Sequence, residues 1–424
     1  MTALRTPLCG VFNNRVLRSL ALSDVFAFLG VWLTSLTLLT GVYEITHSSF
    51  AQGLVIAAQF GPALLVVPIA GHILDRFNPV IFLIGCRSIC AAIAIVLFAA
   101  GSQMPVAVVL ILFVTFSSVF SLSVMATGVL MPLAVSAPDL ARANILLRVI
   151  PNLMMVASGL FLMIEGPALG VYGEHLLAGI AFGLAVFALV PLCFLAPSKQ
   201  HGVQSNQRIS GSFLQGLVYL SKTPELGLRF LLRMGVFVCT GAVILLAVIA
   251  ETEFSNIANA VGLFFAARGS GMVLGSVAAM PFLKRPEQFE AFVLFAGLCL
   301  FAGGIVLASW TVSAGLLLTA LALGIAFAGE GIAKPVSLTV LQKRVAPEYL
   351  GRVMALEQGL SGVVQTLLTL VIAACLVAPT DTRIVMTAIG LCAGALLVAL
   401  LALAVMRRDP GVATHPQNPE AADA

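Results

Sequence analysis

Long apolar runs constrain this sequence more than any other of its features. An α-helix needs about 20 apolar residues to cross the roughly 30 Å hydrocarbon core of a bilayer. None of the runs alternates apolar with polar residues, as the strands of a membrane barrel do. We therefore expect an all-α membrane protein. Cut at charges, prolines and polar turns, the sequence predicts twelve spanning helices, at residues 18–41, 51–73, 80–100, 106–130, 143–164, 175–196, 229–250, 257–281, 289–309, 312–336, 353–377 and 383–406.

The composition agrees with this interpretation of the runs. Of the 424 residues, 60% are hydrophobic and only 9% are charged. Soluble domains carry about 25% charged residues, and so few charges could not cover the surface of a water-soluble chain of this length. The composition therefore excludes a soluble enzyme, a disordered protein and a nucleic-acid-binding protein, and it makes the lipid bilayer the first partner of the chain.

Lysine and arginine residues predict the orientation of the chain, because the cytoplasmic loops of membrane proteins are enriched in them. With the N-terminus in the cytoplasm, only Arg383 falls on the outer side, which instead carries Glu44, Glu174, Glu251 and Glu253. A missed or added span would scramble this alternation, so we expect an even number of spans and two cytoplasmic termini. The inner side receives sixteen basic residues: Arg5, Arg15, Arg18, Arg76, Arg142, Lys199, Arg208, Lys222, Arg229, Lys284, Arg285, Lys343, Arg344, Arg352, Arg407 and Arg408.

The longest connection between runs is polar and divides the chain into two halves of six spans. Within it, residues 213–220 are apolar enough to lie along the inner membrane face as an amphipathic piece. The small and polar residues at the C-terminus predict a disordered tail. The expected organisation is an N-terminal bundle over 1–196, a cytoplasmic linker over 197–228, a C-terminal bundle over 229–408 and a tail over 409–424.

A sequence repeat relates the two halves. The connection after the fourth run reads Ala-Pro-Asp-Leu-Ala-Arg at 137–142, and the one after the tenth reads Ala-Pro-Glu-Tyr-Leu-Gly-Arg at 346–352. Each ends in an arginine, Arg142 or Arg352, directly before an apolar helix. Parallel repeats of six spans are an arrangement of secondary transporters, so the repeat predicts two pseudo-symmetric six-helix bundles.

The loop after the second run carries the groups of a candidate cytoplasmic gate. Gly71 allows helices to approach closely, and Asp75 and Arg76 can take charge or hydrogen-bond partners at helix ends. Breaking such a contact is one way to bias a transporter between its two facings. We assign Arg142 and Arg352 to the same candidate gate; the alternative is that these residues form ordinary solvated turns.

Ionisable residues inside the predicted spans are the candidates for function, because charges in hydrocarbon are costly. Asp24 and Glu330 are the candidate proton-coupling acids: a carboxylate that moves between an apolar site and an arginine changes its proton affinity. The alternative for Asp24 is a structural hydrogen bond. Glu330 and Lys334 stand four residues apart on one helix face, which also allows a static ion pair. The residues concerned are Asp24, Arg87, Arg148, Arg233, Arg268, Glu330 and Lys334.

Other polar residues in the spans suggest a substrate cavity. Small neighbours around Arg268 would let an anionic substrate group or another helix approach, and pairing with Glu330 or Asp24 is the structural alternative. Arg87 and Arg148 lie near the cytoplasmic face, so we expect them to snorkel or to bind an acid of a neighbouring loop. The candidate cavity residues are Arg268, Lys334, Gln59, Gln358 and Gln365.

No motif in the sequence supports an enzyme. There is no Walker A loop, no Gly-x-Ser-x-Gly elbow and no His-Glu-x-x-His pair. The eight cysteines form neither a Cys-x-x-Cys motif nor a Cys/His cluster. We therefore expect no catalytic residue, no cofactor and no metal site.

The loop at residues 71–80 resembles the signature of the major facilitator superfamily, Gly-x-Leu-Ala-Asp-Arg-x-Gly-Arg-Arg. Gly71, Asp75 and Arg76 match it, whereas Asn78 and Pro79 replace the later glycine and the first residue of the basic pair. The resemblance implies the twelve-helix major facilitator fold, whose bundles rock to expose a central cavity to each side in turn.

Four segments, 14–20, 29–33, 42–49 and 347–355, resemble the enterobactin-exporter and macrolide-efflux branch of that superfamily. This branch usually has an aspartate where Val31 stands, so Asp24 or another group would have to take over coupling. The resemblance implies an efflux pump of a bacterial inner membrane that exchanges protons for a small amphiphilic compound, such as a siderophore or a drug. The rival interpretations are a lysophospholipid transporter or flippase, and a membrane sensor or assembly partner without transport activity.

Overall fold

The computed structural model of the chain describes residues 14–62, 66, 77–134, 149–164, 173–195, 213–257, 259–376, 385–387 and 389–390. Throughout these ranges the chain is helical, with turns and bends between the helices and no strand. Nine helices in the described part are long and apolar enough to cross a membrane, and shorter apolar helices cover Ser49–Phe60 and Val149–Ile164. The predicted all-α membrane fold is confirmed.

Five labelled helices and one unlabelled helix build the N-terminal half. Helix α1 packs on α7, which also packs on α4, and α4 packs on α5. Asn14 and Asn78 begin α1 and α4 by accepting hydrogen bonds from the free backbone N–H groups of the first turn. The helices are α1 (Arg15–Thr46), α2 (Ser49–Phe60), α4 (Pro79–Ala100), α5 (Val106–Ala134), the helix Val149–Ile164 and α7 (Glu174–Leu195).

Helix α13 (Leu316–Arg344) is the centre of the C-terminal half and packs closely on α11 (Ala260–Ala279) and α12 (Pro286–Thr311). Glycines make both contacts possible: a Cβ on Gly331 would lie 2.5 Å from the Met272 carbonyl, and one on Gly297 would lie 2.6 Å from the Gly329 carbonyl. The remaining helices of this half are α8 (Phe213–Lys222), α9 (Pro224–Gly241), α10 (Ile244–Glu253) and α14 (Pro347–Cys375).

The predicted span over 229–250 is found as one span, Pro224–Glu253, but the structure interrupts its helix between α9 and α10. Tighter three-residue backbone hydrogen bonds replace the α-helical pattern at Ala242 and Val243. The Gly241 carbonyl accepts a hydrogen bond from the Thr369 hydroxyl at 3.0 Å, so the break leaves that group satisfied in the membrane. Apolar periodicity cannot distinguish such a broken helix from a continuous one.

The predicted amphipathic piece of the linker is helix α8, and it lies against the C-terminal half. The Tyr219 ring stacks on the Tyr349 ring with centroids 4.2 Å apart, and the Tyr219 hydroxyl accepts a hydrogen bond from the Ala346 N–H. Leu217 and Val218 on the same helix are exposed. A helix with one docked face and one exposed apolar face fits the membrane boundary.

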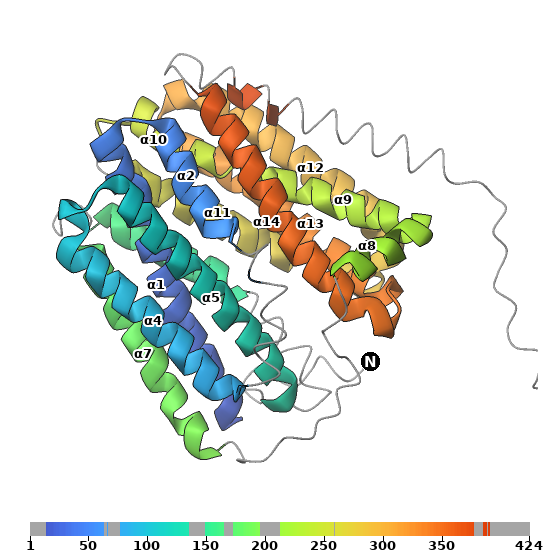
Figure 1. The fold of residues 1–424 in the computed structure, drawn as a ribbon. Coiled ribbons are helices and arrows are strands. Elements are labelled where there is room, and N and C mark those ends of the chain that lie inside the picture. The colour runs from blue at the N-terminus through green and yellow to red at the C-terminus, as the bar shows by residue number, and fades with distance from the viewer. Residues whose placement is uncertain are drawn as a thin grey trace, which may run out of the picture.

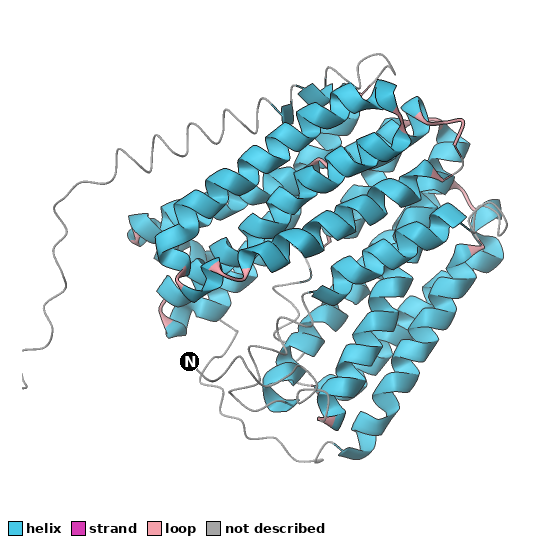
Figure 2. Cartoon of the chain, turned by 180° about the vertical axis from the view of Figure 1, so that it is seen from behind, coloured by secondary structure: helices cyan, strands magenta, loops and turns pink. Residues whose placement is uncertain are grey.

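The two halves meet at one end of the molecule, which carries the end of α1, the start of α2 and the start of α11. In Figure 1 the two sets of helices come together at this closed end, near α10, and diverge toward the marked N-terminus; Figure 2 shows the same from behind. The backbones of Gly159 and Gly262 pack against each other across the halves, with no room for a Cβ on either residue. Gly53 likewise leaves no room for a Cβ beside the Ala373 methyl group.

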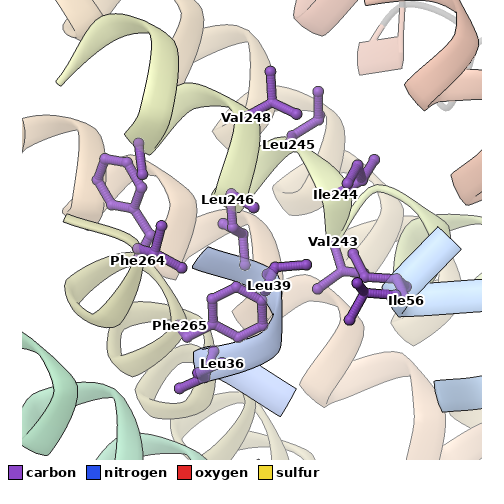
Figure 3. Close-up of a cluster of buried hydrophobic side chains, with 14 of the residues drawn as sticks. Leu36, Leu39, Ile56, Val243, Ile244, Leu245, Leu246, Val248, Phe264 and Phe265 are labelled. Carbon is purple, nitrogen blue, oxygen red and sulfur yellow. The ribbon is translucent and has the colours of Figure 1, made fainter. Parts of the chain in front are cut away.

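The buried cores follow the same division. One hydrophobic cluster at the closed end joins both halves, and Figure 3 shows Leu36, Leu39 and Ile56 of the first half against Val243 and Phe265 of the second. At the opposite end each half has a cluster of its own, around Leu83 in the N-terminal half and around Phe230 in the C-terminal half. Among the described residues, the bundles therefore share an apolar core at the closed end and have separate cores at the other.

Candidate functional site

A small pocket lies between the halves, next to the shared core. In this structure its free volume is about 10 Å³, close to what one water molecule needs, and it is partly open to the surroundings. Its lining includes the polar side chains of Gln59, one of the candidate cavity residues, and of Ser35. The remaining lining is apolar and aromatic, and the residues come from α1, α2, the α9–α10 junction and α11: Trp32, Ser35, Leu36, Leu39, Val55, Ile56, Gln59, Phe60, Val243 and Phe265.

Trp32 is fixed in the wall of this pocket. Its indole N–H donates a hydrogen bond of 3.0 Å to the Pro151 carbonyl, which holds the ring toward the C-terminal half. There it contacts Phe265, with ring centroids 6.2 Å apart. An indole with its polar edge satisfied presents an apolar face, so this wall suits an apolar ligand.

Glu330 lies at the centre of a buried charge cluster in the C-terminal half. Its side chain is 0% exposed and Oε1 lies 2.5 Å from the Lys334 ammonium, so the predicted pair forms. The Thr240 hydroxyl donates a hydrogen bond of 2.5 Å to the same oxygen. The second carboxylate oxygen lies 4.0 Å from the Arg268 guanidinium, so Glu330 is the nearer of the two acids considered for Arg268, while Asp24 pairs with Arg87.

The close packing of α13 on α11 explains how this cluster forms. Gly329 and Gly331 flank Glu330, and a Cβ on either would overlap the backbone of a neighbouring helix. With no side chains in the way, the two helix backbones approach until Arg268 of α11 reaches Glu330 of α13. The glycines therefore determine how close Arg268 and Glu330 lie, in addition to how closely the helices pack.

Arg268 also reaches the N-terminal half. Its guanidinium donates a hydrogen bond to the Met155 sulfur at 3.3 Å and lies 5.0 Å from the centre of the Phe327 ring. The side chain is 4% exposed, and its Nε has no hydrogen-bond partner among the described residues. A thioether is a weak acceptor, so this buried guanidinium keeps most of its donor capacity.

A second buried pair, Arg233 of α9 and Glu357 of α14, lies close by at 2.6 Å. Arg233 also donates to the Ser337 hydroxyl and to the Lys334 carbonyl, at 2.9 and 3.0 Å. The sequence interpretation named Arg233 but missed Glu357. Its position inside the predicted apolar run 353–377 was the available signal.

Pro335 lies inside α13, directly after Lys334. A proline has no N–H to offer the carbonyl four residues earlier. The freed Gly331 carbonyl accepts a hydrogen bond of 3.3 Å from the Ser276 hydroxyl of α11. The Gly331 carbonyl thus stays satisfied next to the charge cluster although α13 contains a proline.

The N-terminal half holds one buried pair in its described part, between Asp24 of α1 and Arg87 of α4. Arg87 also donates to the Ser23 hydroxyl, and both members of the pair lie within reach of the Thr127 hydroxyl, at 3.4 to 3.5 Å. The expectation that Arg87 snorkels or binds a loop acid is wrong. The side chain is 2% exposed and its acid comes from a helix, because Asp24 and two hydroxyls satisfy it inside the bundle.

The other predicted residues lie apart from this pocket. Gln365 is buried and Gln358 is exposed, both on α14. Arg352 lies over the Tyr349 ring at 5.3 Å, against Gly216 of α8. The predicted gate residues Gly71, Asp75, Arg76 and Arg142, together with Arg148, lie outside the described residues.

The site combines an apolar pocket between the halves with buried ion pairs on both sides of it. Within the described ranges, no three His, Cys, Asp or Glu side chains are placed to hold a metal ion. Charged groups buried in a membrane protein and aimed at an interface between helices can bind an ionic substrate or carry a proton. The arrangement supports binding and release rather than bond chemistry.

Comparison with known proteins supplies the family. A family model described as the Major Facilitator Superfamily matches residues 20–368. No curated protein matches the sequence.

Solved structures supply the fold. A transporter of the POT family in complex with a thioalcohol-conjugated peptide superposes with a TM-score of 0.70 at 13% identity, over 96% of this chain and 100% of that one. A mutant of the nucleoside transporter NupG gives 0.70 at 16% identity, over 92% and 99%. The human organic anion transporter MFSD10 gives 0.64 at 15% identity, over 94% and 100%.

Proposed function

The chain belongs to the Major Facilitator Superfamily, and from this premise we propose that it exports a small amphiphilic compound in exchange for protons, by alternating access. Membership of the superfamily and the transporter folds of the similar structures support a secondary transporter rather than an enzyme. The direction of transport, the coupling to protons and the assignment to the efflux branch are all part of the proposal. The location in a bacterial inner membrane is part of it as well.

The observation that carries the proposal is the one-sided contact between the halves. The shared core and the Gly159–Gly262 contact lie at the closed end, while each half keeps a separate core at the other end. Two bundles joined at one end are one of the two states that alternating access requires. The pocket lies where both bundles meet, so a bound compound would lose half of its site when they separate.

The described basic residues support an orientation for this state. Arg15, Arg18, Lys222, Arg229 and Arg344 all lie toward the end where the halves have separate cores. Basic residues mark cytoplasmic loops, so the separated end faces the cytoplasm and both predicted termini lie there. In this orientation the structure is an inward-facing state, ready to take a compound from the cytoplasm or the inner leaflet.

A flux assay tests the function. The chain is reconstituted in liposomes with an imposed pH gradient, and the movement of siderophores, macrolides and lysophospholipids is followed. Gradient-dependent flux of a siderophore or a macrolide supports the proposal, and flux of lysophospholipid alone supports the rival lipid transporter. If none of the compounds moves with the gradient, the proposal fails and the sensor interpretation takes its place.

Asp24→Asn tests the proposed proton carrier. Asparagine keeps the size of the side chain but cannot release a proton, so we expect pH-driven flux to fall at least about tenfold, while exchange of the compound without a gradient persists. The matched control is Glu225→Gln, which removes a carboxylate that is 66% exposed and should leave flux unchanged. Full pH-driven flux in Asp24→Asn would remove this residue from coupling.

A further inference from the structure

Arg268 narrows the kind of compound that the pocket can take. A guanidinium has five N–H donors and is always charged. Among the described residues, those of Arg268 meet one thioether at 3.3 Å and one carboxylate oxygen at 4.0 Å, and Nε meets no partner. For a side chain that is only 4% exposed, this leaves much of its hydrogen-bond donor capacity unused. A buried donor without an acceptor costs free energy, so such a group calls for a ligand.

Glu330 balances only part of the positive charge around it. Its Oε1 is held at 2.5 Å by Lys334 of the next helical turn and by Thr240, and its Oε2 lies 4.0 Å from Arg268, too far for a hydrogen bond. Arg268, Lys334 and Glu330 together carry one surplus positive charge, since Arg233 and Glu357 neutralise each other at 2.6 Å. One negative charge from outside the chain would balance the cluster.

The pocket places an apolar surface beside this charge. Phe265 lines the pocket and precedes Arg268 by three residues on α11, so the two side chains lie on the same face of the helix. Trp32 packs against Phe265 from the N-terminal half, and Met155 touches Arg268 from the same half. A molecule that fills the pocket therefore has the guanidinium one helical turn away.

We infer that the transported compound carries one anionic group, which binds Arg268, while its apolar part lies against Trp32, Phe60 and Phe265. The inference rests on the proposed function, because it identifies the pocket as the transport site. The anionic group is a carboxylate or a chemically similar oxyanion, for which the guanidinium offers paired donors. Lys334 stays with Glu330 and does not need to move.

A matched pair of probes tests the charge. The two probes, 4-bromobenzoate and 4-bromobenzamide, have the same ring and bromine but differ by one negative charge, and bromine quenches tryptophan fluorescence on contact. The chain has two tryptophans, and Trp310 is 75% exposed on the surface of the helices. In the full chain with Trp310→Phe, the quenching therefore reports on Trp32 alone.

We expect saturable quenching by 4-bromobenzoate at concentrations about tenfold lower than by 4-bromobenzamide. Arg268→Gln should remove this preference and leave the affinity for the amide unchanged, Arg268→Lys should keep part of it, and Arg285→Gln, at an exposed site, should change nothing. Size-exclusion chromatography and helical circular dichroism check that each variant folds.

The outcomes separate this inference from the proposed function. Equal affinity for both probes, no saturable quenching by the benzoate, or a preference that persists in Arg268→Gln overturns the inference, even if the chain moves drugs in the flux assay. The chain can also prefer benzoate in a way that depends on Arg268 and yet show no pH-driven flux. That result supports the anion site and overturns the proposal of proton-driven export.

Discussion

At the scale of single residues, the buried charges differ in how far the sequence reveals them. The Glu330–Lys334 pair was predicted because both residues lie on one turn of one helix, where spacing alone fixes their proximity. The partners of Asp24 and Arg233 lie 63 and 124 residues away along the chain. Only the packing of helices brings them together, so spacing could not select them, and the position of Arg87 near a span end favoured the wrong partner.

Glu330→Gln should destabilise the protein strongly. Removing the carboxylate leaves the buried Arg268 and the partly exposed Lys334 without their shared counter-ion, and breaking a buried pair costs about 3–5 kcal/mol. The double variant Glu330→Gln/Lys334→Met removes one of the cations as well and should recover part of that loss.

Thermal unfolding in detergent measures this difference. The control is Glu225→Gln, because the Glu225 side chain is 66% exposed and losing its contact with Arg229 should cost less than about 1 kcal/mol. A double variant that is less stable than Glu330→Gln alone would contradict a simple ion pair at this position.

At the scale of elements, the sequence predicted where helices lie better than where they break or touch. The apolar runs located the helices, because burial in lipid requires the same length of apolar chain wherever the helix packs. The break between α9 and α10 was not predicted, because Gly241, Ala242 and Val243 continue the apolar pattern. The helix that packs against each glycine was not predicted either, because the sequence shows a small residue but not its neighbour in space.

Gly262→Ala tests whether the contact between bundles at the closed end sets the resting state. The added methyl group would overlap the Gly159 carbonyl across the two halves, which should disfavour the closed end by about 1–3 kcal/mol. We expect a cysteine placed at Gln59, in a background without the eight native cysteines, to react faster with an impermeant thiol reagent from the closed side.

Gly85→Ala is the matched control for this measurement. A Cβ at Gly85 meets no atom within 4 Å, so alanine should leave the reaction rate unchanged and add a little helix stability. Equal rates in Gly262→Ala and Gly85→Ala would show that the glycine contact does not hold the two bundles together.

At the scale of the whole molecule, packing joins the two bundles, and no ion pair among the described residues crosses between them. Every ion pair in the described part of the chain joins residues of the same half. The described hydrogen bond from Arg268 to the Met155 sulfur crosses between the halves, and it is a weak one. Separating the halves at the closed end therefore exposes apolar surface but breaks no described salt bridge.

The orientation of the molecule is open to a direct test. We expect a cysteine at His47 to be labelled by an impermeant reagent from outside intact cells, and one at Lys343 only after the membrane is permeabilised. Both side chains are exposed and lie at opposite ends of the helices. Labelling of position 343 in intact cells would reverse the proposed sidedness and, with it, the inward-facing assignment.

The pocket between α1 and α11 has a consequence for inhibition. Trp32 and Phe265 form opposite walls that belong to different bundles, and they are in contact only while the closed end stays closed. A molecule that binds both aromatic rings much more tightly than the transported compound does would stabilise the closed end and slow the change to the other state. Such a compound would inhibit the carrier without being transported, and its potency would depend on its affinity for both rings together.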